Sequence, residues 1–98
     1  MIRRKSFKKD PSARLDYTWD LQHWLEEGEQ VTDRTITADS GITVEARAAY
    51  LSIAPDGKSV SEWVKGGTDG TSYKITCHFV TSAGREDDDT ITIRCVNK

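Results

Sequence analysis

The sequence has few of the residues on which disulfide scaffolds and metal sites depend. Its 98 residues contain two cysteines, two histidines and two prolines. Two cysteines are too few for a disulfide scaffold, and neither lies in a CxxC pair or near histidines at the spacing of zinc ligands. We therefore interpret Cys77 and Cys95 as buried free thiols, because an unpaired cysteine behaves as a small apolar side chain.

Long apolar runs are also missing. No stretch approaches the roughly 20 consecutive apolar residues of a membrane-spanning helix, and residues 1–10 lack the apolar centre of a signal peptide. We expect a protein that is made in the cytoplasm and binds no membrane. Hydrophobic residues make up only 36% of the chain, but they fall in alternating clusters, which indicates a folded domain.

No pattern in the sequence predicts catalysis. Nucleophilic catalysis needs a base beside the nucleophile, and the only histidines, His23 and His78, are interpreted as packed or solvated. Residues 66–70 are rich in glycine but lack the lysine and the following helix of a phosphate-binding loop. The acidic run 86–89 lacks the spacing of a calcium loop, so we interpret it as a solvated hairpin tip and leave cation binding open. The sequence predicts no enzyme, no cofactor and no metal.

Charge is distributed unevenly along the chain. The first ten residues hold five of the 14 basic residues and one acidic residue, and the remaining 88 hold nine basic against fifteen acidic ones. The boundary falls at Asp10-Pro11, because proline disfavours helix in the preceding residue and cannot donate to a sheet ladder. We predict a basic N-terminal arm over residues 1–12 and an acidic domain over residues 13–98.

Alternating apolar and polar residues predict strands in this domain. The clearest alternation covers 73–79 and 91–95, which a short connection containing Ala83-Gly84 should join as an antiparallel hairpin. Alternation also covers 15–19, and shorter or less regular strands are expected near 29–37, 42–44, 50–53 and 60–64. Between the first two strands, Asp20 should cap a short helical turn that ends at Gly28.

Six or seven short strands without a long helix or a repeat indicate an all-β domain. At 98 residues the chain has room for one core. We predict an immunoglobulin-like antiparallel β-sandwich with one short helical turn, with a small barrel as the alternative. Both cysteines would face inward on neighbouring strands of one sheet, unlike the disulfide between the sheets of secreted immunoglobulin domains. The predicted core aromatic residues are Trp19, Trp24, Trp63, Tyr73 and Phe79.

The basic arm has three possible roles: it binds an acidic neighbouring subunit, stays a solvated tail, or binds nucleic acid. Clustered lysine and arginine can neutralise phosphates, but the acidic domain would repel a duplex and only Phe7 offers a ring for stacking. We favour a neighbouring subunit, since charge complementarity gives register and steering. The predicted partner-binding residues are Arg3, Arg4, Lys5, Phe7, Lys8 and Lys9.

Two parts of the chain resemble a family of small structural proteins of tailed phages. The first part contains Lys9-Asp10-Pro11, Leu15-Asp16-Tyr17-Thr18-Trp19-Asp20, Trp24-Leu25 and Gly28-Glu29, and the second contains residues 64–73 and 81–87. The resemblance implies an immunoglobulin-like virion protein of the fiber-tail adaptor or head-tail type, without an active site. It also implies several copies or a homo-oligomer, bound to capsid, portal, tail or fiber subunits.

Two other functions stay open. A carbohydrate-binding or host-attachment module would need Trp24, Trp63 and Tyr50 exposed as a platform. A nucleic-acid-binding regulator would use the basic arm and would lose affinity steeply with added salt. We favour the virion adaptor over both.

Overall fold

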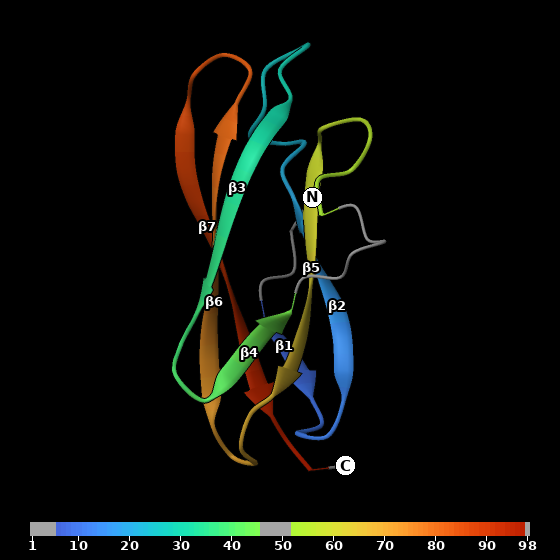
Figure 1. The fold of residues 1–98 in the computed structure, drawn as a ribbon, viewed down its shortest axis with the longest axis vertical. Coiled ribbons are helices and arrows are strands. Elements are labelled where there is room, and N and C mark those ends of the chain that lie inside the picture. The colour runs from blue at the N-terminus through green and yellow to red at the C-terminus, as the bar shows by residue number, and fades with distance from the viewer. Residues whose placement is uncertain (1–5, 46–51, 98) are drawn as a thin grey trace.

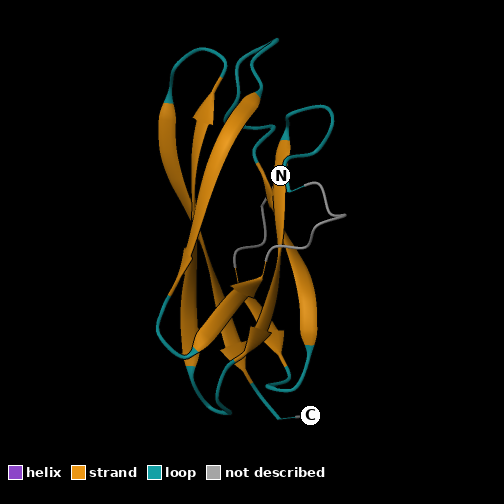
Figure 2. Cartoon of the chain, in the orientation of Figure 1, coloured by secondary structure: helices purple, strands orange, loops and turns teal. Residues whose placement is uncertain are grey.

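The computed structural model describes residues 6–45 and 52–97, and every regular element in these two ranges is a strand (Figures 1 and 2). The seven strands are β1 (Ser6–Lys9), β2 (Arg14–Asp20), β3 (Val31–Ala38), β4 (Ile42–Glu45), β5 (Ser59–Gly66), β6 (Ser72–Thr81) and β7 (Glu86–Cys95). The strand expected near 50–53 lies partly outside the described residues, and Ile53 forms an isolated bridge with Val60.

The strands form two sheets that pack face to face (Figure 1). One sheet has the order β1-β7-β6-β3 and the other has the order β2-β5-β4, and every pair except β1 with β7 is antiparallel. When the strands are lettered in chain order, the sheets contain the neighbours G-F-C and B-E-D of an immunoglobulin domain. The predicted immunoglobulin-like sandwich is therefore confirmed, and the barrel alternative is excluded.

The core lies between the sheets and follows the predicted alternation on β6 and β7. Ile75, Cys77 and Phe79 point inward from β6, and Ile91, Ile93 and Cys95 point inward from β7; all six are buried. β6 and β7 pair antiparallel, from Ser72 opposite Arg94 to Val80 opposite Glu86, which confirms the predicted hairpin. Both cysteines are buried and free, as the sequence predicted.

Tyr73, the second residue of β6, has an arrangement typical of immunoglobulin domains. Its hydroxyl oxygen accepts a hydrogen bond of 2.9 Å from the Thr68 N–H, five residues upstream. This is the tyrosine corner that fixes the approach to strand F in such domains. Gly67 lies beside it with φ of +99°, and a Cβ at this position would collide with Cys95 Sγ.

The predicted helical turn is a single turn of chain. The Leu25 N–H donates to the Leu21 carbonyl over 3.0 Å, and the Asp20 carboxylate accepts from the Gln22 N–H over 3.1 Å. One turn is too short to form a stable helix by itself, because fixing the first turn costs more conformational entropy than its hydrogen bond returns. Gly28, with φ of +80°, lets the chain turn toward β3.

The sandwich begins earlier than the predicted boundary between arm and domain. β1 lies within residues 1–12, pairs in parallel with β7 and ends with the buried Lys9 opposite Cys95. Phe7 is partly buried against the core. The described part of the segment is therefore an edge strand of the sheet, and any arm lies N-terminal to Ser6. Arg3, Arg4 and Lys5 lie outside the described residues.

Trp63 differs from the other aromatic residues predicted in the core. Trp19, Tyr73 and Phe79 are buried there, and Trp24 packs partly against them. On β5, however, alternation assigns the inward positions to the neighbours Val60, Glu62 and Val64. Trp63 therefore takes a half-buried position on the outer face of its sheet.

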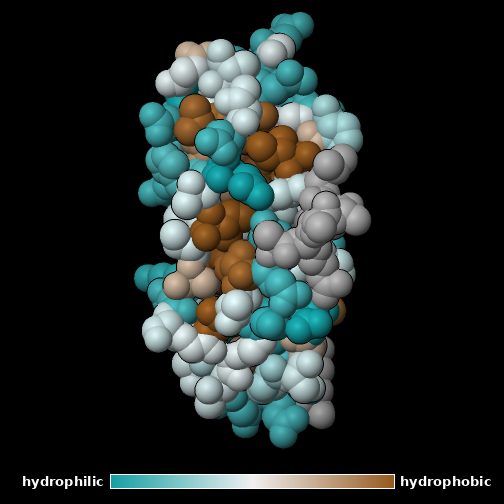
Figure 3. Space-filling model, viewed as in Figure 1, coloured by the Kyte–Doolittle hydropathy of each residue, from teal (hydrophilic) through white to brown (hydrophobic). Residues whose placement is uncertain are grey.

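The core is not wholly apolar on the side of the sandwich where edge strands β3 and β4 meet. Glu62, although buried, points inward and pairs with Arg34 over 3.6 Å. Figure 3 shows apolar side chains reaching the surface on this view of the molecule. A hollow of about 310 Å³ is lined there by Arg34, Thr35, Ile36, Val44 and Glu62.

Candidate partner-binding surface

The N-terminal strand is fastened to the sandwich by Lys9 and Phe7. The buried Lys9 ammonium donates to the Gly66 carbonyl over 2.7 Å and to the Asp10 carbonyl over 2.9 Å. Gly66 ends β5 in the opposite sheet, so the lysine links the two sheets. The Phe7 ring packs edge-on against Tyr17 with centroids 5.1 Å apart. Two of the six residues predicted to bind a partner therefore act inside the domain.

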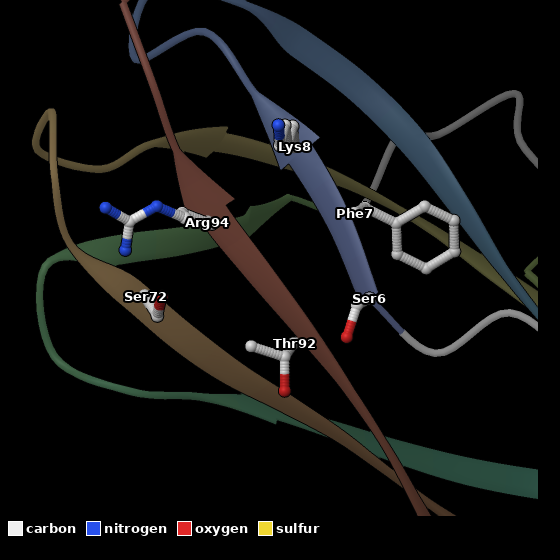
Figure 4. A pocket seen from close by; sticks show the side chains of 6 residues that line it. All are labelled: Ser6, Phe7, Lys8, Ser72, Thr92 and Arg94. Carbon is white, nitrogen blue, oxygen red and sulfur yellow. The ribbon is translucent and has the colours of Figure 1, made fainter.

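Lys8 points the other way and lies on the outer face of the four-stranded sheet. It stands opposite Arg94 of β7, and both side chains are exposed. They border a shallow hollow of about 470 Å³, where the Phe7 ring points away from the hydroxyl groups of β1 and β7 (Figure 4). Its lining residues are Ser6, Phe7, Lys8, Ser72, Thr92 and Arg94. Cationic groups beside hydroxyl groups suit an acidic partner.

The outer face changes charge along the strands. We call Lys8, Lys74 and Arg94 the basic end, and Asp33, Glu86 and Asp88 the acidic end. Strand pairing places a row of threonines, Thr37, Thr76 and Thr90, between the ends, and the Thr76 and Thr90 hydroxyls lie 2.9 Å apart. At about 3.3 Å per residue, the six positions from Arg94 to Asp88 span about 20 Å.

The acidic run 86–89 belongs to β7 and is not the hairpin tip that we predicted. It begins the strand because its four residues pair with β6 from Val80 to Cys77; Asp89 is buried, and Glu86, Asp87 and Asp88 are exposed. The tip is formed by residues 82–85, where Gly84 has φ of +80°. Glu86 and Asp88 therefore lie on the outer face of the sheet.

His78 joins this acidic end through both ring nitrogens. Nδ1 lies 2.7 Å from an Asp88 carboxylate oxygen and Nε2 lies 2.9 Å from a Glu86 carboxylate oxygen. Hydrogen bonding to Glu86 first, and then to Asp88, raises the pKa of His78 above its usual range. Only the register between β6 and β7 shows which carboxylates His78 meets.

The opposite end of the core contains a partly buried ionic network that the sequence analysis missed. Arg85 donates two hydrogen bonds to the Glu29 carboxylate, one of them from Nε over 2.9 Å, and the Thr81 hydroxyl donates a third. These bonds, that of Arg85 above all, lower the pKa of Glu29 to about 2. The network ties the segment between β2 and β3 to the β6–β7 hairpin.

Trp24 is part of the same end. The Arg85 guanidinium carbon lies 3.9 Å from the centre of the Trp24 ring. The same ring forms an edge-to-face pair with Phe79, with centroids 4.9 Å apart. Arginine stacked on tryptophan is a favourable cation–π arrangement. Trp24 therefore serves packing rather than presenting an open platform to a sugar.

The described residues give little support for nucleophilic or metal chemistry. Burial raises the pKa of the Cys77 thiol to about 12, so that it stays protonated and poorly nucleophilic. Within residues 6–45 and 52–97, no group of three or more His, Cys, Asp or Glu side chains is placed to hold a metal ion. No helix in the described part of the chain is long and apolar enough to cross a membrane.

The sequence matches, over residues 9–94, the family model described as podophage GP4 fiber-tail adaptor protein gp77. The chain belongs to this family. The match confirms the resemblance found in the sequence. No curated protein matches the chain.

The range matched by the adaptor family separates two groups of residues. It includes Lys9, the tyrosine corner and the network of Glu29 and Arg85, which hold the sandwich together. Arg3, Arg4, Lys5, Phe7 and Lys8 precede it. Membership of the adaptor family therefore rests on the sandwich, and a role for the basic N-terminal segment needs its own argument.

Proposed function

We propose that this adaptor-family protein is a structural component of a phage particle and joins neighbouring virion subunits through its basic N-terminal segment and the adjoining outer face of the sheet. It acts by binding and carries out no catalysis. The observation that carries the proposal is the basic end, where Lys8 and Arg94 flank a hollow on an otherwise acidic domain. The segment with Arg3, Arg4 and Lys5 leads directly into β1 beside that hollow.

Anchoring makes this surface suitable for an adaptor. Because Lys9 is bonded inside the domain, Lys8 is held at a fixed place on the outer face. A partner that contacts the N-terminal segment is therefore positioned relative to the whole sandwich. Complementary charge guides such a contact and fixes its register more than it adds affinity. We propose acidic surfaces of capsid, portal, tail or fiber subunits as partners.

The two other functions have weaker support. A sugar platform would need Trp24 and Trp63 on one surface, but Trp24 packs beside the β6–β7 hairpin and Trp63 occupies an outward position of β5. Tyr50 lies outside the described residues. For a nucleic acid, the basic end is small and the same face becomes acidic at Glu86 and Asp88, which would repel phosphates.

Particle assembly tests the proposal. A phage in which the gene is inactivated would be supplied in trans with R3E/R4E, or with R14E/K65E as a control that makes the same change in charge on the outer face of the other sheet. The copy number in purified particles would be measured against the major capsid protein. We expect R3E/R4E to lose incorporation and the control to keep it. Equal incorporation of both variants would overturn the proposed role of the N-terminal segment.

A further inference from the structure

The outer face of the four-stranded sheet is mostly polar and divided by charge. Its basic end and acidic end each hold three charged side chains, and small threonines separate them. Asp39 lies at the rim beside Lys74, whose backbone N–H it accepts over 2.8 Å. Among the described residues, the exposed large apolar side chain is Leu15, which belongs to the other sheet. An apolar partner therefore has little to bind on this face.

We propose that a second copy of this chain docks on this outer face, with its strands antiparallel to those of the first. Charge complementarity identifies the partner as a second copy, because each copy presents both a basic end and an acidic end. A contact in which two copies use the same patch is isologous and closes with two-fold symmetry. The inference goes beyond the proposed attachment to other virion subunits. Both contacts use the basic end, so a given copy makes one or the other there.

The arrangement of charges selects one of the two ways in which identical faces can pack with a two-fold axis. An axis parallel to the strands would place basic end on basic end. An axis across the strands, along the row of Thr76 and Thr90, instead reverses the strand direction. It brings Arg94 over Glu86 of the second copy. Lys74 comes over His78, beside the Asp88 carboxylate that His78 contacts. The threonine row is small enough for the sheets to approach to about 10 Å.

The size of the face predicts a weak contact. Four strands spaced about 4.8 Å apart and about 20 Å of strand length give a patch of roughly 300 Å² per copy. Stable interfaces bury about 800 Å² per partner. Pairing should therefore depend on protein concentration and weaken with added salt, which screens exposed charges. In a particle that holds many copies, such contacts act together.

Sedimentation equilibrium of the full chain measures this pairing directly. Samples up to about 1 mM would be compared in about 50 mM and about 500 mM NaCl. The variants K74E/R94E and E86K/D88K each bring like charges together, so each should weaken self-association by about tenfold or more. An equimolar mixture of the two should associate again, because each variant then meets opposite charges. The controls R14E/K65E and D16K/E27K change the net charge equally away from this face.

The mixture makes the test specific. Recovery of association only in the mixed sample, with both controls pairing as the unaltered chain does, would support the proposal. A chain that stays monomeric at every concentration, charge variants that pair as tightly as the unaltered chain, or a mixture that stays monomeric would each overturn it. Circular dichroism and the melting temperature would show that each variant folds, and E86Q/D88N would replace E86K/D88K if that variant does not. The incorporation of R3E/R4E into particles is a separate readout, so failure of one proposal is distinguishable from failure of the other.

Discussion

Replacement of Gly67 by alanine tests the packing of the tyrosine corner. Gly67 has φ of +99°, which an L-residue adopts at a cost of about 1–2 kcal/mol. Its Cβ would also collide with the buried Cys95 Sγ, and overpacking of a core costs about 1–3 kcal/mol. The sum, about 2–5 kcal/mol, is a large part of the roughly 5–15 kcal/mol that stabilises a domain. We expect the melting temperature to fall by roughly 10–30 °C.

Gly70→Ala is the matched control for this experiment. Gly70 has a similar φ of +82° but no atom within 4 Å of an added Cβ, so only the backbone cost applies. A second control removes the obstacle: in a Cys95→Ala background, Gly67→Ala should lose the collision cost of about 1–3 kcal/mol. Urea unfolding followed by tryptophan fluorescence gives the free energy of unfolding for each variant. Equal losses for Gly67→Ala and Gly70→Ala would refute the close packing described for this corner.

Three further predictions concern titration, anchoring and thiol reactivity. The pKa of His78, measured by NMR titration, should lie above 6.5 and return toward its ordinary value in E86Q/D88N. Because the pKa is raised in the folded state, the contacts of His78 stabilise the fold fully below the unfolded pKa. This stabilisation is lost as the pH rises through the folded pKa. An unshifted midpoint would contradict the contacts with both carboxylates. Lys9→Ala should lower the free energy of unfolding by about 2–4 kcal/mol, because the Gly66 and Asp10 carbonyls lose a donor and the core loses a side-chain stem. Lys8→Ala should change the free energy of unfolding by less than about 0.5 kcal/mol. Equal effects of the two substitutions in urea unfolding would contradict the buried anchor. Cys77, with a pKa of about 12, should react with a maleimide only when the domain opens, so labelling at pH 7 without denaturant would contradict its burial.

The strongest sequence patterns predicted the strands that have one solvent-exposed face and one buried face. On β6 and β7 an apolar residue occurs at every second position, so alternation alone identified both strands and their hairpin. The sequence analysis did not predict β1, because this strand has four residues, of which only Phe7 is apolar. Its inward lysine is tolerated because the Gly66 and Asp10 carbonyls accept its hydrogen bonds, a condition that no local pattern reveals.

The candidate surface was harder to predict than the fold because it depends on register. Lys8 and Arg94 are 86 positions apart in the chain and become neighbours only when β1 joins β7. The same holds for Glu29 and Arg85, which meet across the end of the sandwich. Sequence reasoning identified charged segments but could not say which charges become neighbours across the strands. Trp63 shows the converse error, since its apolar character suggested the core while its strand phase places it outside.

The most direct test of the central claim is the protein composition of purified particles of the phage that encodes this chain. Particles would be digested and the chain quantified by mass spectrometry against the major capsid protein. The account predicts that the chain is present at a fixed copy number in every preparation. Absence of the chain from intact, infectious particles would contradict its assignment as a structural adaptor of the virion.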